Sequence, residues 1–273
     1  MRRLFKSNDG LLIEDEGKFF SIEHTLTDLL SMNSNEARSI IKAASNSVTA
    51  PTQLVAPIDS FHEVWACGVT YLRSKVGRME ESEIPDLYSR VYEADRPEIF
   101  YKSIGWRVIP NGQPVGIRRD SGWDVPEAEV VLVLNSQQEI FGYTIGNDMS
   151  SRSIEGENTL YLPQAKSYEK ACTIGSFIVP AWEIEEAIFP FSLKVERNGA
   201  EVFSGNSSSD QMKRSFSELV EWLFKSLSMP SGAMLFTGTG IVPDAEFTLR
   251  EGDIVKIDGG VLGNLVNPVV LVP

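Results

Sequence analysis

Three carboxylates stand at the two ends of an apolar hairpin pattern. The stretch DVPEAEVVLVLNSQQEIFGYTIGNDMSSR covers residues 124–152 and carries Glu127, Glu129 and Asp148. Its two halves, EVVLVLN and EIFGYTIGND, are β-branched and aliphatic, and the polar NSQQ between them predicts the turn of a β-hairpin. Glu127 and Glu129 share one face because strand side chains alternate, and folding about the turn brings Asp148 opposite or diagonal to Glu127. The pattern therefore predicts that the three carboxylates converge.

The chemistry that such a cluster permits is the binding of a hard divalent cation. Carboxylates that converge in a partly buried site repel one another, so the arrangement needs either full exposure or a cation. Oxygen-only ligation suits Mg²⁺, Mn²⁺ or Ca²⁺, and three side chains leave positions open for water and substrate. A solvated acidic strand end fits the same residues, and short motifs are weak evidence alone. On these residues by themselves, the solvated strand end is favoured.

A second group of candidates comes from RPEIFYKS, in which a strand is expected to begin at Glu98 after a proline. Lys102 lies four residues further on and points to the same side as Glu98 and Phe100, because side chains alternate along a strand. The stretch from Arg73 to Glu98 mixes both signs of charge densely. That mixture indicates a solvated helix face for most of its charges.

Few residues are available for nucleophilic or zinc chemistry. The chain has two histidines, His24 and His62, and two cysteines, Cys67 and Cys172. These are too few for a disulfide framework or a zinc cage, so both thiols are expected to be buried and reduced. The absence of GxSxG, GxGxxG and GxxxxGKS removes the usual support for hydrolase-elbow, dinucleotide and nucleotide-phosphate sites. Nucleophilic catalysis would have to use His62, for which a structural role is favoured.

The composition limits the classes of molecule that the protein is expected to bind. The 273 residues carry a formal net charge of −13, which argues against nucleic acid or an anionic membrane, because phosphates are bound by clustered Lys and Arg. No segment approaches about 18 uninterrupted apolar residues, and the start MRRLFKSNDG turns polar before an apolar signal region could develop. We expect a cytoplasmic protein that acts on small molecules.

The elements that position these residues fall into two parts. Residues 1–55 are expected to form a small N-terminal α+β domain, with strands in GLLIEDEGKFFSI and a helix in TLTDLLSMNSNEARSIIKAAS. Residues 56–273 show short apolar runs between Gly, Pro, Asn and Asp, which is typical of a strand-rich domain with interspersed helices. In that part SSSDQMKRSFSELVEWLFKSLS predicts a serine-capped helix. Its apolar, core-facing positions are Met212, Phe216, Leu219, Val220 and Leu223.

Seven stretches together resemble the fumarylacetoacetate hydrolase family: WACGVTY, RPEIFYKS, PEAEVVLVL, GYTIGNDMSSRSIEG, LPQAKSYEKACTIGSFIVP, GTG and LREGDIVKIDGGVLGNLVNPV. The likeness covers residues 57–268 and is specific in combination, whereas any one piece would be weak. The resemblance implies an α+β fold with a mixed β-roll, assembled as a homodimer or a dimer of dimers. It also implies that Glu127, Glu129 and Asp148 bind Mg²⁺ or Ca²⁺, which chelates the 2-oxo acid part of a substrate. With the resemblance, the ion becomes the favoured explanation of the three carboxylates.

The family's reactions on 2-oxo acids include hydrolysis, decarboxylation, isomerisation, hydration and dehydration, so membership leaves the reaction open. Many hydrolytic or decarboxylating relatives carry an Asn-Tyr pair followed by a water-activating histidine, whereas VTYLRSK has Thr70 for the Asn and Ser74 in the histidine position. RPEIFYKS and IEGENTLYLPQAKSYEKACTIG resemble the branch that contains 2-keto-3-deoxy-D-arabinonate dehydratase. The expected function is a Mg²⁺-dependent lyase that dehydrates a 2-keto-3-deoxy sugar acid to a dioxo acid. The alternative is a C–C bond hydrolase or decarboxylase acting on acylpyruvate-type 2-oxo acids.

In that branch, residues matching Lys166 and Glu98 lie at the reacting carbons. The resemblance implies that one of the two is a base and the other an acid, and it leaves open which is which. One takes a proton from C3 to form an enolate, and the other protonates the leaving C4 hydroxyl. The TGTG loop resembles a family loop whose glycines let backbone N–H groups approach the substrate carboxylate. The candidate substrate-binding residues are Lys102, Ser103, Arg152, Thr237, Gly238 and Thr239. Further candidates for the pocket are Tyr71, Ser150 and Ser151.

Overall fold

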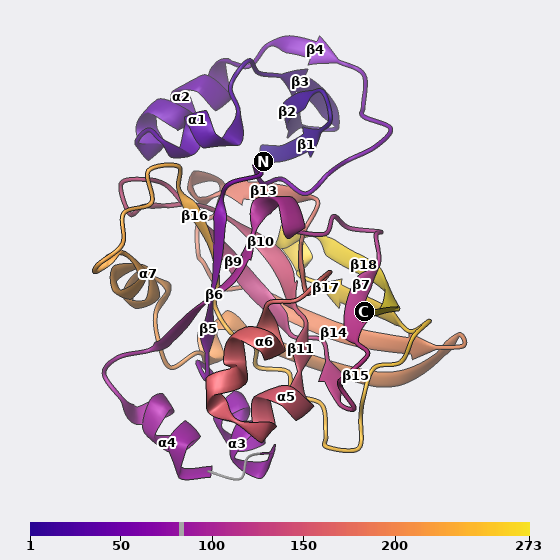
Figure 1. Cartoon of the computed structure of the whole chain (residues 1–273). Helices are drawn as coiled ribbons and strands as arrows, with labels where there is room; N and C mark the ends of the chain where they lie inside the picture. Colours follow the sequence, from indigo (N-terminus) through magenta and orange to yellow (C-terminus); the bar gives the residue numbers. More distant parts are fainter. Residues whose placement is uncertain (82–84) are drawn as a thin grey trace.

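The computed structural model describes residues 1–81 and 85–273 (Figure 1). The strands of its main sheet are β1 (Arg3–Ser7), β2 (Gly10–Asp15), β3 (Lys18–Ser21), β4 (Asn46–Val48), β5 (Glu63–Gly68), β6 (Glu98–Ile104), β9 (Ala128–Leu134), β10 (Ile140–Asp148), β12 (Cys172–Ile174), β13 (Phe177–Pro180) and β16 (Ala233–Phe236). They lie in the order β4-β3-β2-β1-β13-β10-β9-β16-β5-β6, with β12 paired to β10. The pairing of β16 with β5 is parallel and that of β9 with β10 is antiparallel, so the sheet is mixed, as expected.

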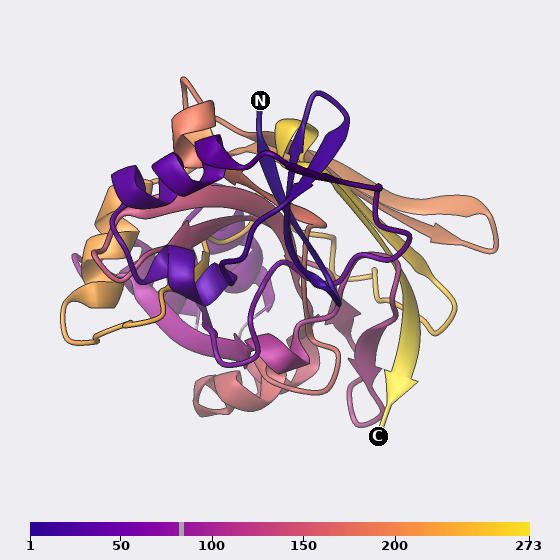
Figure 2. The same ribbon diagram turned by 90° about the horizontal axis from the view of Figure 1, so that it is seen from above.

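A second sheet packs against the first. Its strands are β7 (Val115–Arg118), β14 (Pro190–Arg197), β15 (Ala200–Ser208), β17 (Ile254–Asp258) and β18 (Asn264–Val272). They lie in the order β15-β14-β17-β18-β7, while β8 (Asp124–Val125) and β11 (Ser150–Ser151) form a separate two-stranded ribbon. The hairpin of β14 and β15 projects from the side of the molecule (Figure 2).

The central strand β9 contributes to two hydrophobic cores. Val130 and Leu132 face one core, which they share with Leu193 of β14 and Val255 of β17. Val131, between them, faces the other core. The alternation follows from the two-residue period of a strand, and burial of both faces explains why EVVLVLN reads as a continuous apolar run rather than an alternating one.

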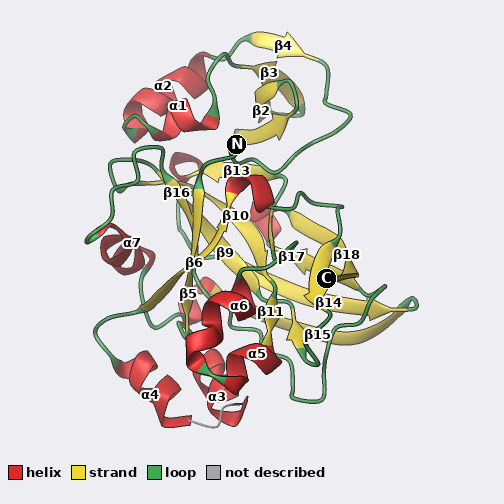
Figure 3. Ribbon diagram, viewed as in Figure 1, coloured by secondary structure: helices red, strands yellow, loops and turns green. Residues whose placement is uncertain are grey.

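The described helices are α1 (Leu26–Leu30), α2 (Ser34–Ala43), α3 (Leu72–Glu81), α4 (Pro85–Glu93), α5 (Arg152–Glu157), α6 (Leu162–Lys166) and α7 (Phe216–Phe224). Figure 3 shows α3 to α6 grouped at the end of the molecule opposite α1 and α2. The charged stretch from Arg73 to Glu98 contains most of α3, all of α4 and the first residue of β6, and its residues 82–84 lie outside the described part. Among the described residues, no helix combines the length and the apolar character that crossing a bilayer takes.

The N-terminal segment continues the main sheet through the pairing of β1 with β13, in which Leu4 lies opposite Ile178. Leu26 and Leu29 of α1 share a core with Val131 of β9. Residues 1–55 are therefore joined to the rest of the chain by strand pairing and by packing. That they form a domain of their own stays a prediction.

Two helices differ from the sequence pattern. The single helix expected within TLTDLLSMNSNEARSIIKAAS is broken into α1 and α2, because the Asn33 side chain accepts hydrogen bonds from the N–H groups of Asn35 and Glu36 and caps a new helix. The helix expected within residues 207–228 is shorter, since Ser215 caps α7 and Met212 lies before it. The apolar spacing therefore wrongly indicated that Met212 belongs to the helix.

Candidate active site

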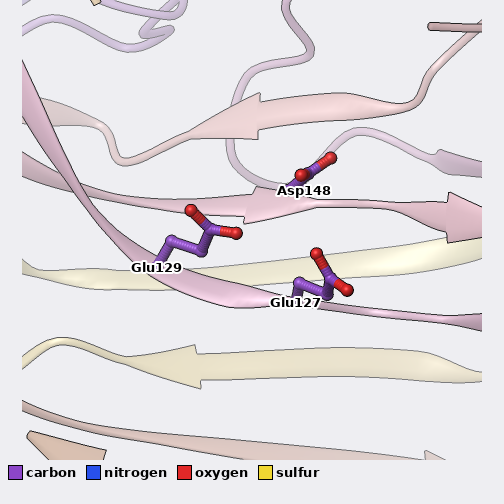
Figure 4. Close-up of side chains that lie close together, drawn as sticks. All are labelled: Glu127, Glu129 and Asp148. Atoms are coloured by element: carbon purple, nitrogen blue, oxygen red, sulfur yellow. The ribbon is translucent and has the colours of Figure 1, made fainter. Parts of the chain in front are cut away.

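The hairpin of β9 and β10 brings the three predicted ligands together. Gly146 lies opposite Glu129 and Asn147 opposite Ala128, which places Asp148 across from Glu127. One carboxylate oxygen from each of Glu127, Glu129 and Asp148 lies within 4.8 Å of the others, and all three residues are buried. Figure 4 shows the three side chains close together at the hairpin. The predicted convergence is confirmed.

Glu129 is held by the predicted TGTG loop. The Gly238 N–H donates a 2.6 Å hydrogen bond to Glu129 Oε2. Gly238 has φ +91°, and a Cβ there would lie 2.0 Å from Thr70 Oγ1, so the loop needs glycine at this position. The Thr70 hydroxyl in turn donates to the Thr237 carbonyl at 2.6 Å. Thr70 thus fixes the loop that orients the Glu129 carboxylate.

Lys166, the last residue of α6, lies directly at the triad. Its Nζ is 2.5 Å from Glu127 Oε2 and 3.1 Å from Asp148 Oδ2, and it donates to Ser150 Oγ at 2.6 Å. The side chain is only 3% exposed. The short helix begins with Pro163 at its first turn, which suits a proline because no N–H is needed there. The structure thus places Lys166 at the triad, and its catalytic role stays a prediction.

Lys102 lies behind the triad and outside the pocket lining. Its ammonium contacts Asp148 Oδ1 at 2.5 Å and donates to the Met149 carbonyl at 2.9 Å and to the Lys166 carbonyl. Its side chain has no exposed surface. These contacts orient Asp148 and the end of α6. The structure therefore does not bring the Lys102 side chain to the position of a substrate-binding group.

Arg152 connects the triad to a carboxylate that the sequence analysis did not single out. Arg152 begins α5, and its Nη2 donates to Glu127 Oε1 at 2.8 Å. Its Nη1 lies 4.0 Å from Oε2 of Glu155, one helical turn further on. Glu155 is buried and lines the same pocket as the triad. The i, i+3 spacing from Arg152 in SRSIEGE was the signal that could have found it.

A pocket opens at the triad. Glu98 and Phe100 reach it from β6, and a Cβ on Gly68 of β5 would lie 2.1 Å from Glu98 Oε2. Only a residue without a side chain leaves room for the Glu98 carboxyl at this point. The lining residues are Cys67, Gly68, Val69, Ser74, Glu98, Phe100, Glu127, Glu129, Arg152, Glu155, Lys166, Gly238 and Thr239.

Besides Lys102, five predicted pocket residues lie outside this lining. The Ser103 hydroxyl is turned to the Ile104 carbonyl, and the Thr237 hydroxyl donates to the Val130 carbonyl. Ser151 caps α5 by accepting from the Ile154 N–H, and the buried Tyr71 packs against the position of Gly240. Ser150 is at the site only through its bond to Lys166.

The electrostatics of the site favour an additional cation. Burial, followed by the charges of Asp148 and Glu127, raises the pKa of Glu129 well above its ordinary value. Burial and the Glu129 charge also raise the pKa of the Cys67 thiol, which disfavours a thiolate. Five carboxylates at the site, those of Glu98, Glu127, Glu129, Asp148 and Glu155, face the cations of Lys102, Arg152 and Lys166. Three carboxylates that converge in a buried site with oxygen as the only ligand type fit a divalent ion such as Mg²⁺.

His62 is far from the pocket. It precedes β5, whereas Gly68 at the other end of that strand lines the pocket, a separation of roughly 20 Å for an extended chain. Its Nε2 lies 3.0 Å from Thr27 Oγ1, and its Nδ1 accepts from the Asp59 N–H. Burial lowers the pKa of His62 to about 4. The structural role expected of His62 is confirmed. Its distance from the pocket excludes it as a base that activates water there.

Comparisons with known proteins agree with this geometry. A family model described as the C-terminal part of fumarylacetoacetate hydrolase matches residues 64–270. A probable 2-keto-3-deoxyxylonate dehydratase of Haloferax volcanii is 41% identical over 259 residues, which cover 94% of this chain and 88% of the relative. A 2-dehydro-3-deoxy-D-arabinonate dehydratase of Saccharolobus solfataricus is 38% identical over 222 residues, 80% of this chain and 74% of the relative.

A solved structure of 2-keto-3-deoxy-D-arabinonate dehydratase complexed with magnesium and 2,5-dioxopentanoate has a similar fold. It superposes with a TM-score of 0.86 at 29% identity, and the match covers 100% of this chain and 99% of that one. The similarity thus extends over the N-terminal segment as well as the pocket.

Proposed function

The chain belongs to the fumarylacetoacetate hydrolase family, and from this membership we propose that it is a Mg²⁺-dependent dehydratase of a 2-keto-3-deoxy sugar acid. A five-carbon acid such as 2-keto-3-deoxy-D-arabinonate would be converted to a dioxo acid with loss of one water. The observation that carries the proposal is the buried triad with Lys166 on it, inside a pocket that a further carboxylate, Glu98, enters from β6. The dehydratase relatives support the choice of reaction.

Glu127, Glu129 and Asp148 would hold the ion. A divalent cation there would act as a Lewis acid toward the carboxylate and 2-oxo oxygens of the substrate, which makes the C3 protons more acidic. Magnesium is the ion of the similar solved structure. Ca²⁺ and Mn²⁺ prefer the same oxygen ligands and are proposed as replacements.

The chain's own groups would then move the protons. Lys166 would take a proton from C3, and Glu98 would give one to the C4 hydroxyl as it leaves. Lys166 is suited to the first role by its place at the triad, and Glu98 to the second by its approach from another strand against Gly68. Gly238, with its N–H turned to Glu129, and Thr239 line the side of the pocket where the substrate carboxylate would lie.

The hydrolase or decarboxylase alternative has little support. Ser74, which occupies the histidine position of hydrolytic relatives, donates to the Tyr71 carbonyl and accepts from the Tyr71 N–H. Neither histidine is among the residues that line the pocket. Without an imidazole, the described part of the pocket lacks the usual group for activating a water molecule.

A substrate screen tests the proposal. The protein would be incubated with 2-keto-3-deoxy pentonates and hexonates and, separately, with acylpyruvates and oxaloacetate, each with and without Mg²⁺. We expect a product that is one water lighter, formed from at least one 2-keto-3-deoxy acid and only with the ion. Cleavage of an acylpyruvate in place of water loss would contradict the dehydratase and favour the hydrolase.

A further inference from the structure

This inference rests on the proposed function and concerns the far end of the substrate. Loss of water across C3 and C4 of a 2-keto-3-deoxy pentonate gives a conjugated 2-oxo acid with a C3=C4 double bond and a hydroxyl still on C5. The product bound to the similar solved structure is 2,5-dioxopentanoate, which carries an aldehyde at C5. Going from one to the other requires a proton to leave C5. The dehydratase therefore needs a base near C5 as well as one at C3.

The distance of such a base from the triad has an upper limit. If C1 and C2 are held at the triad, C5 lies about 4 Å beyond C2, since each C–C bond spans about 1.5 Å. Arg152 bonds Glu127 Oε1 through Nη2 and lies 4.0 Å from Glu155 Oε2 through Nη1. Because the guanidinium is small and planar, Glu155 Oε2 lies at most about 9 Å from Glu127 Oε1. This upper limit is compatible with a Glu155 carboxylate that reaches the far carbons of the substrate.

The surroundings of Glu155 separate it from the groups already assigned. It enters the pocket from α5, whereas Glu98 enters from β6 and packs against Gly68. Lys166 contacts Glu127 and Asp148 and therefore lies at the end where C2 and C3 would be held. Glu155 is only 6% exposed, and a buried carboxylate in a substrate pocket is suited to proton transfer.

We propose that Glu155 is a further catalytic residue, the base that removes the C5 proton after water has left. The C5–H electron pair forms a C4=C5 double bond, the former C3=C4 pair shifts to C2=C3, and the 2-oxo oxygen takes the negative charge. Protonation at C3 restores the 2-oxo group, and the remaining C5 enol gives the aldehyde when C4 gains a proton and the hydroxyl loses one. The sequence is an isomerisation, so no oxidant or reductant is needed.

The experiment uses a 2-keto-3-deoxy pentonate that the wild-type protein dehydrates, carrying deuterium at C5, and follows it by NMR. In Glu155→Gln we expect the unsaturated acid to accumulate with both deuterium atoms on C5, and the aldehyde to form about a hundredfold more slowly. Deuterium entry from heavy water into C3 of pyruvate, which has no C5, should be unchanged, as should Mg²⁺ affinity. Glu157→Gln is the matched control, since it alters an exposed carboxylate in the same helix.

The outcomes separate the possibilities. Aldehyde formation by Glu155→Gln within a few-fold of the wild-type rate would overturn the role of Glu155 and leave the dehydratase standing. Joint loss of Mg²⁺ affinity, pyruvate exchange and turnover would mean that Glu155 only orients Arg152, which also overturns it. If the wild-type protein removes water from no 2-keto-3-deoxy pentonate, the proposed function fails first and the inference with it.

Discussion

Each of the three proposed metal ligands has a partner that orients its carboxylate. Glu129 accepts from the Gly238 N–H, and Asp148 pairs with the buried ammonium of Lys102. Such partners orient ligands, and their loss typically lowers metal affinity or activity by roughly 10- to 100-fold. A bound ion would compete with these partners for carboxylate oxygens, which would couple ion binding to the contacts of Lys102 and Lys166.

The first prediction concerns the triad. Asp148→Asn should weaken Mg²⁺ binding and activity together, because it removes one of three charged ligands and the partner of Lys102. Titration calorimetry measures the affinity, and Asp120→Asn, which alters an exposed carboxylate paired with Arg118, is the control. Unchanged Mg²⁺ affinity in alanine variants of Glu127, Glu129 and Asp148 would rule the site out.

The second prediction concerns the chemical step. Lys166→Met and Glu98→Gln should retain the ion and still bind substrate, while kcat falls by roughly a hundredfold or more, the usual scale for loss of a general acid or base. The two variants should differ in deuterium entry at C3. Loss of the C3 base abolishes the exchange, whereas loss of the acid leaves it and stops only elimination.

Near-wild-type turnover in both variants would remove the proposed mechanism. Because Lys166 also contacts two ligands, Mg²⁺ affinity has to be measured for each variant by calorimetry. If deuterium entry at C3 were lost in Glu98→Gln and kept in Lys166→Met, Glu98 would be the C3 base and Lys166 the acid.

At the scale of elements, local pattern was enough to predict the hairpin. The turn NSQQ, the two apolar runs and strand alternation together define which residues face one another, and the observed register agrees. The partners of the ligands could not be predicted in this way. Lys102 and Asp148 are 46 residues apart in the sequence, and Glu129 and Gly238 are 109 apart. No local pattern encodes such pairs, so only the family resemblance pointed to the loop.

The helix errors have a related cause. Apolar spacing cannot distinguish one helix from two when a capping side chain such as Asn33 interrupts it, nor a helix from the chain that enters it, as at Met212. Helix ends depend on which N–H groups a neighbouring side chain satisfies. That choice is made by the three-dimensional structure as a whole.

The third prediction concerns the segment that leads into β5. His62 stays neutral in the folded protein until about pH 4, but in the unfolded chain it binds a proton near 6.5. Its contribution to stability is therefore complete above pH 6.5 and is lost as the pH falls from 6.5 through 4. Between pH 7 and pH 5 the loss should be about 2 kcal/mol.

Urea unfolding at pH 7 and pH 5 measures this loss. In His62→Gln the fall in unfolding free energy between the two pH values should shrink by about that amount, since glutamine does not titrate in this range. His24→Gln changes the other histidine and is the control. An equal pH dependence in wild type and His62→Gln would contradict the assignment.

At the scale of the whole molecule, the sequence resemblance motivates an assembly. We predict a homodimer in solution, in which pairs could associate further into a dimer of dimers, and a cytoplasmic location. Light scattering at micromolar concentration tests the first point. A mass near 30.3 kDa, that of one chain, would count against the dimer.

Because both faces of β9 are buried, we can predict which parts of the protein unfold first and which unfold last. Since β9 belongs to two hydrophobic cores, its amide hydrogens should exchange with solvent only when the whole protein opens. Helices α5 and α6 are six and five residues long and can fray alone. Glu129 lies in β9 and Glu127 next to it, so these two proposed ligands should be among the last residues to be exposed, whereas Lys166 and Glu155 lie in short helices that we expect to open earlier. At low denaturant concentrations, the protein should therefore lose its enzymatic turnover while it still binds the ion.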